Sequence, residues 1–189
     1  MAVMTALEPA GLFTRADFEK LPEFPGETRY RYELLDGAII VSPSPGLAHQ
    51  QAVLELAVLL REAAPSGLMV AVSPLDTYLP TGDVLEPDVL VFDPAIIVDD
   101  KLQGGVPLLA VEVLSPSSRR RDVGDKLTAY RDAGVPSYWV VDPIDPRLRA
   151  WSLVDGAYVE IADVSGDEEW TAAAPYAVTF RPSDLTAGH

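Results

Sequence analysis

Two carboxylates stand in or beside apolar runs that are typical of buried β-strands. Asp88 precedes such a run in "LEPDVLVFDP" (residues 85–94), and Glu112 lies inside "LLAVEVLS" (108–115). Ionised carboxylates are rarely buried without a partner. If the two strands are neighbours, the start of one and the end of the next bring both side chains to one edge of the sheet. Two carboxylates that lie so near each other repel unless a cation lies between them.

Magnesium is the cation that suits such a pair. It prefers oxygen ligands and is commonly held by one or two carboxylates together with phosphate oxygens of a substrate. The chain has no cysteine and only two histidines, His49 and His189, so a metal site here would be built from oxygen. The same spacing also allows a purely structural interpretation. In that case Asp88 caps a turn after Pro87, and Glu112 pairs with an arginine of "SRRR" (118–121).

A helix predicted after Glu112 carries further polar side chains. Asp122, Lys126 and Tyr130 are spaced by four residues and therefore share one helix face, which Arg119 would extend if the helix begins early. If this face is directed at the strand end, the Lys126 ammonium approaches a metal-bound water or a scissile phosphate. The alternative is a surface pair of Asp122 and Lys126, which would contribute only ~0.3–0.5 kcal/mol.

The charge of the chain narrows the possible partners. A net charge of -15 argues against a general nucleic-acid coat protein, because phosphate contacts need clustered Lys and Arg. Positive charge is concentrated in one stretch, residues 115–131, where five basic residues stand against two acidic ones. The ordinary interpretation of Arg119, Arg120 and Arg121 is a solvated helix start.

Length and composition indicate one globular domain. The chain has 189 residues, of which 48% are hydrophobic and 23% charged. No apolar run approaches the ~20 residues that cross a bilayer, and the first residues lack the pattern of a secretory signal. We therefore expect a soluble, cytoplasmic protein that is a single domain over 1–189.

The hydrophobic patterns predict an α/β fold centred on one mixed sheet. Thr14 and Gly134 are expected to begin and end helices, and Asp36-Gly37 and Asp155-Gly156 to form hairpin turns. The predicted elements are a helix at 14–21, a hairpin at 30–45, a helix at 48–63, strands at 69–79, 85–94 and 108–114, a helix at 122–133, a strand at 136–143 and a hairpin at 147–164. For residues 165–189 we expect a polar loop, a short strand at 175–180 and a turn before a frayed end, without chemistry.

Three segments taken together resemble the Uma-two restriction endonuclease family, a branch of the PD-(D/E)XK nuclease superfamily. They are "YELLDG" (32–37), "PDVLVF" (87–92) and "EVLSPSSRRRDVGDKLTAYRDAGVPSYWVVDP" (112–143), and the resemblance covers about residues 15–180. It implies a restriction-endonuclease-like mixed central sheet flanked by helices, with β-hairpins at both ends. It also implies Mg²⁺ or Mn²⁺ at the sheet edge and metal-dependent hydrolysis of DNA phosphodiester bonds.

The resemblance also implies roles for individual residues. Asp88 and Glu112 would be metal ligands, and Val113 would offer its backbone carbonyl as a third. The superfamily motif has lysine two positions after the glutamate, where this chain has Leu114. A leucine cannot orient water or stabilise a charged phosphorane, so Lys126 on the following helix would take over that role.

Two further residues match polar positions of the family pattern. Glu33 in "YELLDG" would lie beside the metal, as a second-metal ligand or a general base. His49 matches an accessory position, although a histidine near the start of a helix is also expected to face solvent. Arg119, Arg120 and Arg121 would hold the phosphate backbone without reading bases, which predicts weak, salt-sensitive DNA binding.

Two other functions compete with the endonuclease. The acidic surface would repel DNA outside the site, which favours a catalytically weak or inactive module that depends on a protein partner. The site would also suit a hydrolase of small phosphate esters. The resemblance further implies a homodimer, because many nucleases of this superfamily pair to cut two strands.

Overall fold

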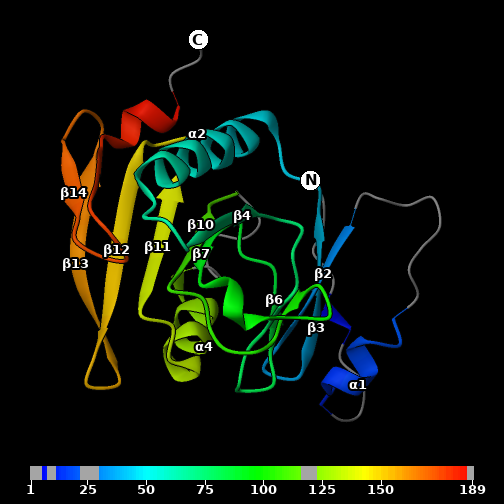
Figure 1. Cartoon of the computed structure of the whole chain (residues 1–189). Helices are drawn as coiled ribbons and strands as arrows, with labels where there is room; N and C mark the ends of the chain where they lie inside the picture. The colour runs from blue at the N-terminus through cyan, green and yellow to red at the C-terminus, as the bar shows by residue number, and fades with distance from the viewer. Residues whose placement is uncertain (1–5, 8–11, 22–29, 116–122, 187–189) are drawn as a thin grey trace.

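The structure is a computed structural model that describes residues 6–7, 12–21, 30–115 and 123–186 (Figure 1). Predicted site residues 119–122 lie outside the described residues. Two large sheets and a small one make up the β-structure, with orders β13-β12-β11-β10-β7-β4, β1-β3-β2-β6-β5-β9-β8 and β14-β15. The prediction of a mixed sheet flanked by helices is confirmed, and the second large sheet adds to it.

The six-stranded sheet contains the strands that carry Asp88 and Glu112. Its β10 and β11 are parallel, and its other neighbouring strands are antiparallel. The strands are β4 (Met69–Val72), β7 (Val89–Phe92), β10 (Leu109–Val113), β11 (Ser137–Asp142), β12 (Arg147–Val154) and β13 (Ala157–Ser165).

The seven-stranded sheet brings the N-terminal hairpin beside the middle of the chain, through one pairing of Leu34 with Val84. The predicted strand 69–79 is therefore divided around Pro74 between the two sheets. The strands are β1 (Ala6–Leu7), β2 (Tyr30–Leu35), β3 (Ala38–Pro43), β5 (Thr77–Tyr78), β6 (Val84–Leu85), β8 (Ile97–Val98) and β9 (Lys101–Leu102).

The helices agree with the predicted pattern in place and type. The side chain of Asp17 accepts hydrogen bonds from the Thr14 backbone N–H and hydroxyl, which fixes the start of the first helix. Gly134 ends another helix with a φ of 85°, a conformation that glycine adopts without strain. The helices are α1 (Arg15–Phe18), α2 (Leu47–Ala63), α4 (Asp125–Ala133) and the 3₁₀ segments η1 (Pro94–Ile96) and η2 (Pro182–Leu185).

Both predicted hairpin turns are two residues long. Asp36 and Gly37 have φ values of 49° and 71°, and Asp155 and Gly156 have 49° and 79°. Two positive φ values in succession are the signature of a type I′ turn, whose twist matches that of the strands it joins. The Asp-Gly pairs therefore set the register of β2 with β3 and of β12 with β13.

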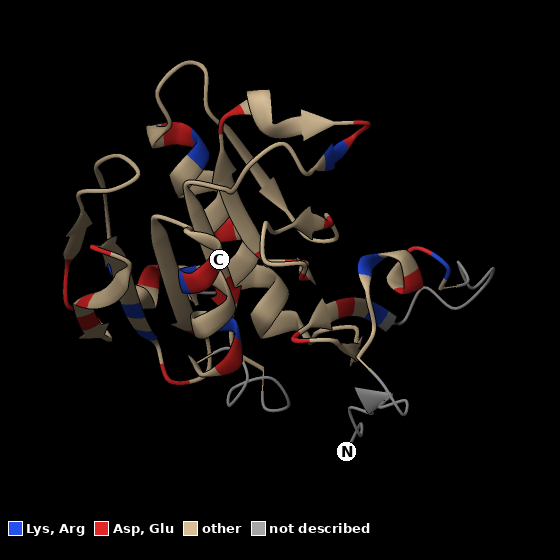
Figure 2. Cartoon of the chain, turned by 90° about the horizontal axis from the view of Figure 1, so that it is seen from below, with Lys and Arg blue, Asp and Glu red and all other residues tan. Residues whose placement is uncertain are grey.

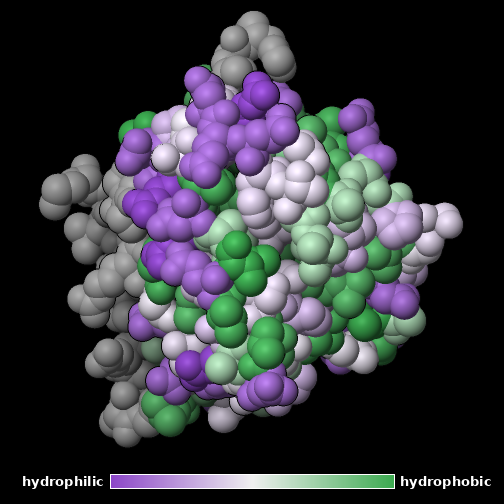
Figure 3. Space-filling model, turned by 90° about the vertical axis from the view of Figure 1, so that its left-hand side faces the viewer, coloured by the Kyte–Doolittle hydropathy of each residue, from purple (hydrophilic) through white to green (hydrophobic). Residues whose placement is uncertain are grey.

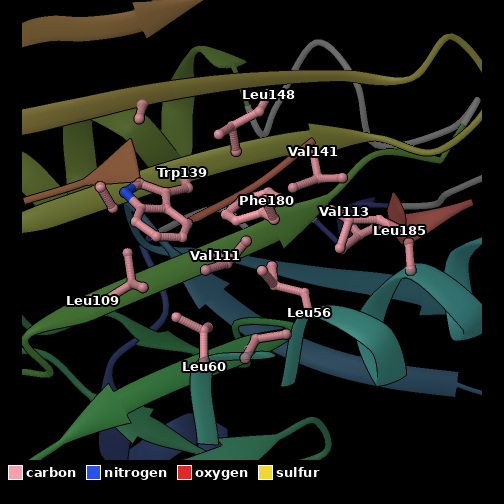
Figure 4. Packing of buried hydrophobic residues seen from close by; sticks show 14 of the residues in the cluster. Leu56, Leu60, Leu109, Val111, Val113, Trp139, Val141, Leu148, Phe180 and Leu185 are labelled. Atoms are coloured by element: carbon pink, nitrogen blue, oxygen red, sulfur yellow. The ribbon is translucent and has the colours of Figure 1, made fainter. Parts of the chain in front are cut away.

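The two faces of the six-stranded sheet bury different layers because side chains alternate along each strand. On one face, Leu109, Val111 and Val113 pack in a cluster with Leu56 and Leu60 of α2. Figure 4 shows this cluster, with Phe180 and Val111 in the middle and Trp139 to one side. The other face carries a second cluster, which includes residues of α4 and of the seven-stranded sheet. The polar residues Asp88 and Glu112 belong to this second face by their place in the alternation.

The C-terminal segment adds to the core. Strands β14 (Trp170–Ala172) and β15 (Val178–Phe180) form a hairpin, and Trp170 meets Trp139 edge to face at 5.0 Å between ring centroids. Leu185 in η2 is fully buried. The predicted short strand is confirmed, but the turn at 181–185 is an ordered 3₁₀ helix because Leu185 anchors it in the α2 cluster.

The outer hairpin exposes several apolar side chains. β13 is an edge strand, and Val154, Val159 and Ile161 are all more than 40% exposed. Figure 3 shows apolar side chains among polar ones on that side of the molecule.

The predicted homodimer stays a prediction. Among the described residues, no helix has the length and hydropathy that a bilayer span requires.

Candidate active site

The register of β7 with β10 brings the two predicted carboxylates together. Val111 pairs with Val89 in this antiparallel ladder, so the next positions outward are Glu112 and Asp88. Beyond that pair, the Asp88 N–H donates to the Val111 carbonyl at 2.9 Å, and the Val113 N–H donates to the Asp88 side chain at 2.8 Å. The side chains of Asp88 and Glu112 are both about 1% exposed. The two buried carboxylates therefore lie close together where β7 begins and β10 ends.

Asp88 is held by three donors from three different parts of the chain. Its Oδ1 accepts from Arg31 Nη1 at 2.8 Å, and its Oδ2 accepts from the Val113 backbone N–H at 2.8 Å and lies 3.1 Å from His49 Nε2. Burial on its own would raise the pKa of Asp88. The hydrogen bond with His49 and the charge of Arg31 outweigh burial and lower the pKa to about 2. Asp88 is therefore ionised at neutral pH.

Lys126 joins the second carboxylate to a third. Its Nζ lies 2.8 Å from Glu33 Oε1 and 2.9 Å from Glu112 Oε1, and all three side chains are at most 2% exposed. Tyr130, one turn later on α4, donates its hydroxyl to the same Glu112 oxygen at 3.0 Å. Burial and the charge of Glu112 raise the pKa of Tyr130 well above its usual value, so its hydroxyl keeps its proton and remains a donor. The predicted face of Lys126 and Tyr130 is thus directed at the strand end.

Glu33 ties the N-terminal hairpin to this site. Burial would raise its pKa, but the charges of Lys126 and Arg31 outweigh burial and lower it. Its Oε1 also accepts from the Glu86 backbone N–H at 3.0 Å. A glutamate of β2 is therefore bound to α4 and to the segment between β6 and β7, which places it within the same group of charges.

Glu86 is the unusual member of the group. The Oε2 atom of Glu86 lies 3.9 Å from Arg31 Nε, and this oxygen has no hydrogen-bond partner among the described residues. Burial raises the pKa of Glu86 to about 8, and the charges of Asp76 and Glu33 add to this effect while Arg31 opposes it. Glu86 is therefore largely protonated at neutral pH.

This raised pKa predicts a pH-dependent effect of Glu86→Gln. Wild type loses stability as the pH rises from about 4.5 through 8, because the folded form holds the Glu86 proton more tightly than the unfolded chain does. Glutamine mimics the neutral form, so the variant should be more stable than wild type by at least about 1 kcal/mol at pH 9 and similar to it at pH 5. Urea unfolding at both pH values measures this difference. Exposed Glu168→Gln is the control, and an equal effect at both pH values would contradict the prediction.

We call the eight side chains that meet here the charged cluster. Its members are Arg31, Glu33, His49, Glu86, Asp88, Glu112, Lys126 and Tyr130. They contain four carboxyl groups, of which Glu86 is largely protonated, and two strongly basic side chains, so three buried carboxylates stand against two cations. Figure 2 shows the same imbalance over the described chain, where acidic residues outnumber basic ones.

Sequence reasoning placed some members of the charged cluster and missed others. His49 is buried, and the expected solvent-facing side chain is not observed. Val113 meets the cluster through its N–H, and the role predicted for its carbonyl stays a prediction. Leu114 is buried in the apolar cluster beside α4. Arg31 and Glu86 were missed, although each stands two residues before a predicted site residue and so shares its strand face or turn.

The charged cluster bears on the divalent metal that the family resemblance implies. No three His, Cys, Asp or Glu side chains among them converge as a metal ion requires, because Lys126 and Arg31 hold the carboxylates instead. The donor chemistry fits Mg²⁺ or Mn²⁺, since the cluster offers oxygen ligands in acid excess. The buried Glu86 Oε2 without a hydrogen-bond partner among these residues points the same way. A bound cation would offset this excess charge.

Comparison with known proteins relates the chain to a family and to solved structures. A family model described as "Putative restriction endonuclease" (Uma2) matches residues 15–183. A crystal structure of a protein described as "a putative nuclease" from Anabaena variabilis has a TM-score of 0.72 and 18% sequence identity, over 92% of this chain and 97% of that chain. At this identity the likeness shows a shared fold, which confirms the predicted fold class. No curated protein matches the chain.

Proposed function

The chain belongs to the Uma2 family of restriction-endonuclease-like proteins, and from this premise we propose that it is a divalent-metal-dependent endonuclease that hydrolyses DNA phosphodiester bonds. One observation carries the proposal. Asp88 and Glu112 are adjacent on neighbouring strands, and a lysine from the next helix lies 2.9 Å from Glu112. Paired carboxylates with a nearby ammonium are the groups that phosphodiester hydrolysis needs.

The proposed metal ligands are Asp88 and Glu112, with the carbonyl of Val113 as a third and Glu33 as an additional acidic group. When bound, Mg²⁺ or Mn²⁺ would lower the pKa of a water molecule and polarise a phosphoryl oxygen. The remaining work falls to the chain itself. His49 and Arg31 hold Asp88 ionised and fix its orientation, as their contacts of 3.1 and 2.8 Å support.

Lys126 and its neighbours are proposed to act on the substrate. Its ammonium would neutralise charge that develops on the phosphate or orient the attacking water, in place of the lysine that Leu114 replaces. Tyr130 positions Glu112 by its hydrogen bond. We propose that the phosphates of the DNA backbone are contacted by Arg119, Arg120 and Arg121, which do not read the sequence. Asp122 is the proposed accessory residue beside them.

Cleavage of supercoiled plasmid DNA tests the proposal. We expect nicking and linearisation that require Mg²⁺ or Mn²⁺ and that fall by at least about a hundredfold in Glu112→Ala, because one ligand of the metal is lost. Glu160→Ala is the matched control, since Glu160 is exposed and pairs only with Arg149 among the described residues. The measurement is the rate of loss of supercoiled plasmid at low salt, with single-stranded circles as a second substrate.

Other outcomes would assign the charged cluster elsewhere. Metal-dependent cleavage that survives in Glu112→Ala would exclude Glu112 as a ligand. No cleavage in either metal at high protein concentration would favour the partner-dependent interaction module, which the net charge of -15 also suits. Release of phosphate from small esters without strand cleavage would favour the small-ester hydrolase. A cytoplasmic location and a homodimer stay predictions.

A further inference from the structure

Lys126 occupies the place between two carboxylates where a metal cation would be expected. Its Nζ makes contacts of 2.8 Å with Glu33 and 2.9 Å with Glu112, and the side chain is only 2% exposed. The ammonium belongs to helix α4, whereas Glu33 and Glu112 belong to strands β2 and β10. The Lys126 ammonium therefore offsets part of the negative charge of Glu33 and Glu112.

We propose that Lys126 is a built-in counter-ion that competes with the divalent cation for Glu112. This inference rests on the proposed function, because it takes Glu112 as a metal ligand. An ammonium and a divalent cation on one buried carboxylate repel each other strongly, since little water screens them. Metal binding therefore requires Lys126 to give up its contact with Glu112.

The contacts of Glu112 explain why the competition falls on this residue. Its Oε1 already accepts from both Lys126 and Tyr130. The Tyr130 hydroxyl is neutral and tolerates a nearby cation, whereas the Lys126 ammonium does not. Asp88 differs because its cationic partner, Arg31, contacts Oδ1, while Oδ2 is held by the Val113 N–H and by His49. Lys126 thus keeps the metal-free site intact at the expense of metal affinity.

Metal affinity in Lys126→Met tests the competition. Calorimetry with Mn²⁺ alone should show at least tenfold tighter binding in the variant than in wild type, because methionine keeps most of the side-chain volume but carries no charge. Lys20→Met is the control, since Lys20 is 74% exposed and far along the chain from the cluster. Equal or weaker Mn²⁺ binding by Lys126→Met would overturn the inference. Binding by neither protein would overturn the proposed metal dependence, and this inference with it.

A measurement on wild type avoids any failure of the variant to fold. The chain has three lysines, Lys20, Lys101 and Lys126, so acetylation of each is easily followed by mass spectrometry. Saturating Mg²⁺ should raise the acetylation rate of Lys126 at least threefold, because the ammonium leaves its buried contact. The rates of Lys20 and Lys101 should not change. If calorimetry detects Mg²⁺ binding but the acetylation rate of Lys126 does not change, the competition is excluded and the proposed metal site is retained.

Discussion

Lys126→Met is expected to lower the free energy of unfolding of the metal-free protein by about 3–5 kcal/mol at pH 7. The reason is the pair of carboxylates that Lys126 joins. Glu33 and Glu112 lie 2.8 and 2.9 Å from its Nζ, with side chains at most 2% exposed. Without the ammonium, two buried negative charges face each other with no cation of α4 between them. Breaking a buried ion pair from one side costs far more than the pair itself contributes.

Urea unfolding in EDTA measures this loss. Lys20→Met supplies the comparison, because its pair with Asp17 is exposed and such pairs contribute about 0–1 kcal/mol. The loss in Lys126→Met should shrink toward pH 5, where one glutamate takes up a proton and the repulsion ends. Adding Glu33→Gln to the variant should restore part of the stability at pH 7. A loss below about 1 kcal/mol would contradict the close, buried contacts of Lys126 with Glu33 and Glu112.

The strands that hold the site could be predicted because their patterns are local. Apolar runs around Asp88 and Glu112 marked two buried strands, and the positions of the two carboxylates at a strand start and a strand end predicted that they meet at one edge of the sheet. Lys126 and Tyr130 followed from their spacing of four on a helix that ends at Gly134. In each case a few adjacent residues determine where the side chain is directed, so a single sequence suffices.

The pairing of the two sheets could not be predicted from such patterns. The pairing of Leu34 with Val84 joins segments 50 positions apart, and no local signal specifies it. This pairing is what carries Arg31 to Asp88 and Glu86 to Glu33. Arg31 was missed for that reason, since on its own strand it looks like an ordinary surface residue.

His49 was expected to face solvent, but its side chain is buried. A polar residue near the start of a helix was expected to face solvent, although His49 stands four and seven residues before Val53 and Leu56 and so shares their buried helix face. In the structure the first turn of α2 lies close to the start of β7, so the ring of His49 reaches Asp88 at 3.1 Å. Only the packing of α2 against the sheet, which involves Leu56 and Leu60, determines this contact.

Asp88→Asn is expected to cost the metal-free protein about 2 kcal/mol at pH 7, with a distinctive dependence on pH. The pKa of Asp88 falls from 3.8 in the unfolded chain to about 2 in the folded protein. A carboxylate with a lowered pKa stabilises the fold fully above pH 3.8, and this contribution disappears as the pH falls toward 2. The asparagine amide has no such charge, and it resembles the neutral carboxyl in shape. The stability difference between the two proteins should therefore close between pH 4 and pH 2.

Urea unfolding in EDTA at pH 7, 5, 4 and 3 follows this difference. Asp163→Asn is the matched control, because Asp163 also pairs with an arginine, Arg147, but is exposed and screened by water. It should show a small effect at every pH. A difference between wild type and Asp88→Asn that stays constant from pH 7 to pH 3 would mean that shape, and not charge, explains the loss. The ion pair with Arg31 and the contact with His49 would then not be what keeps Asp88 ionised.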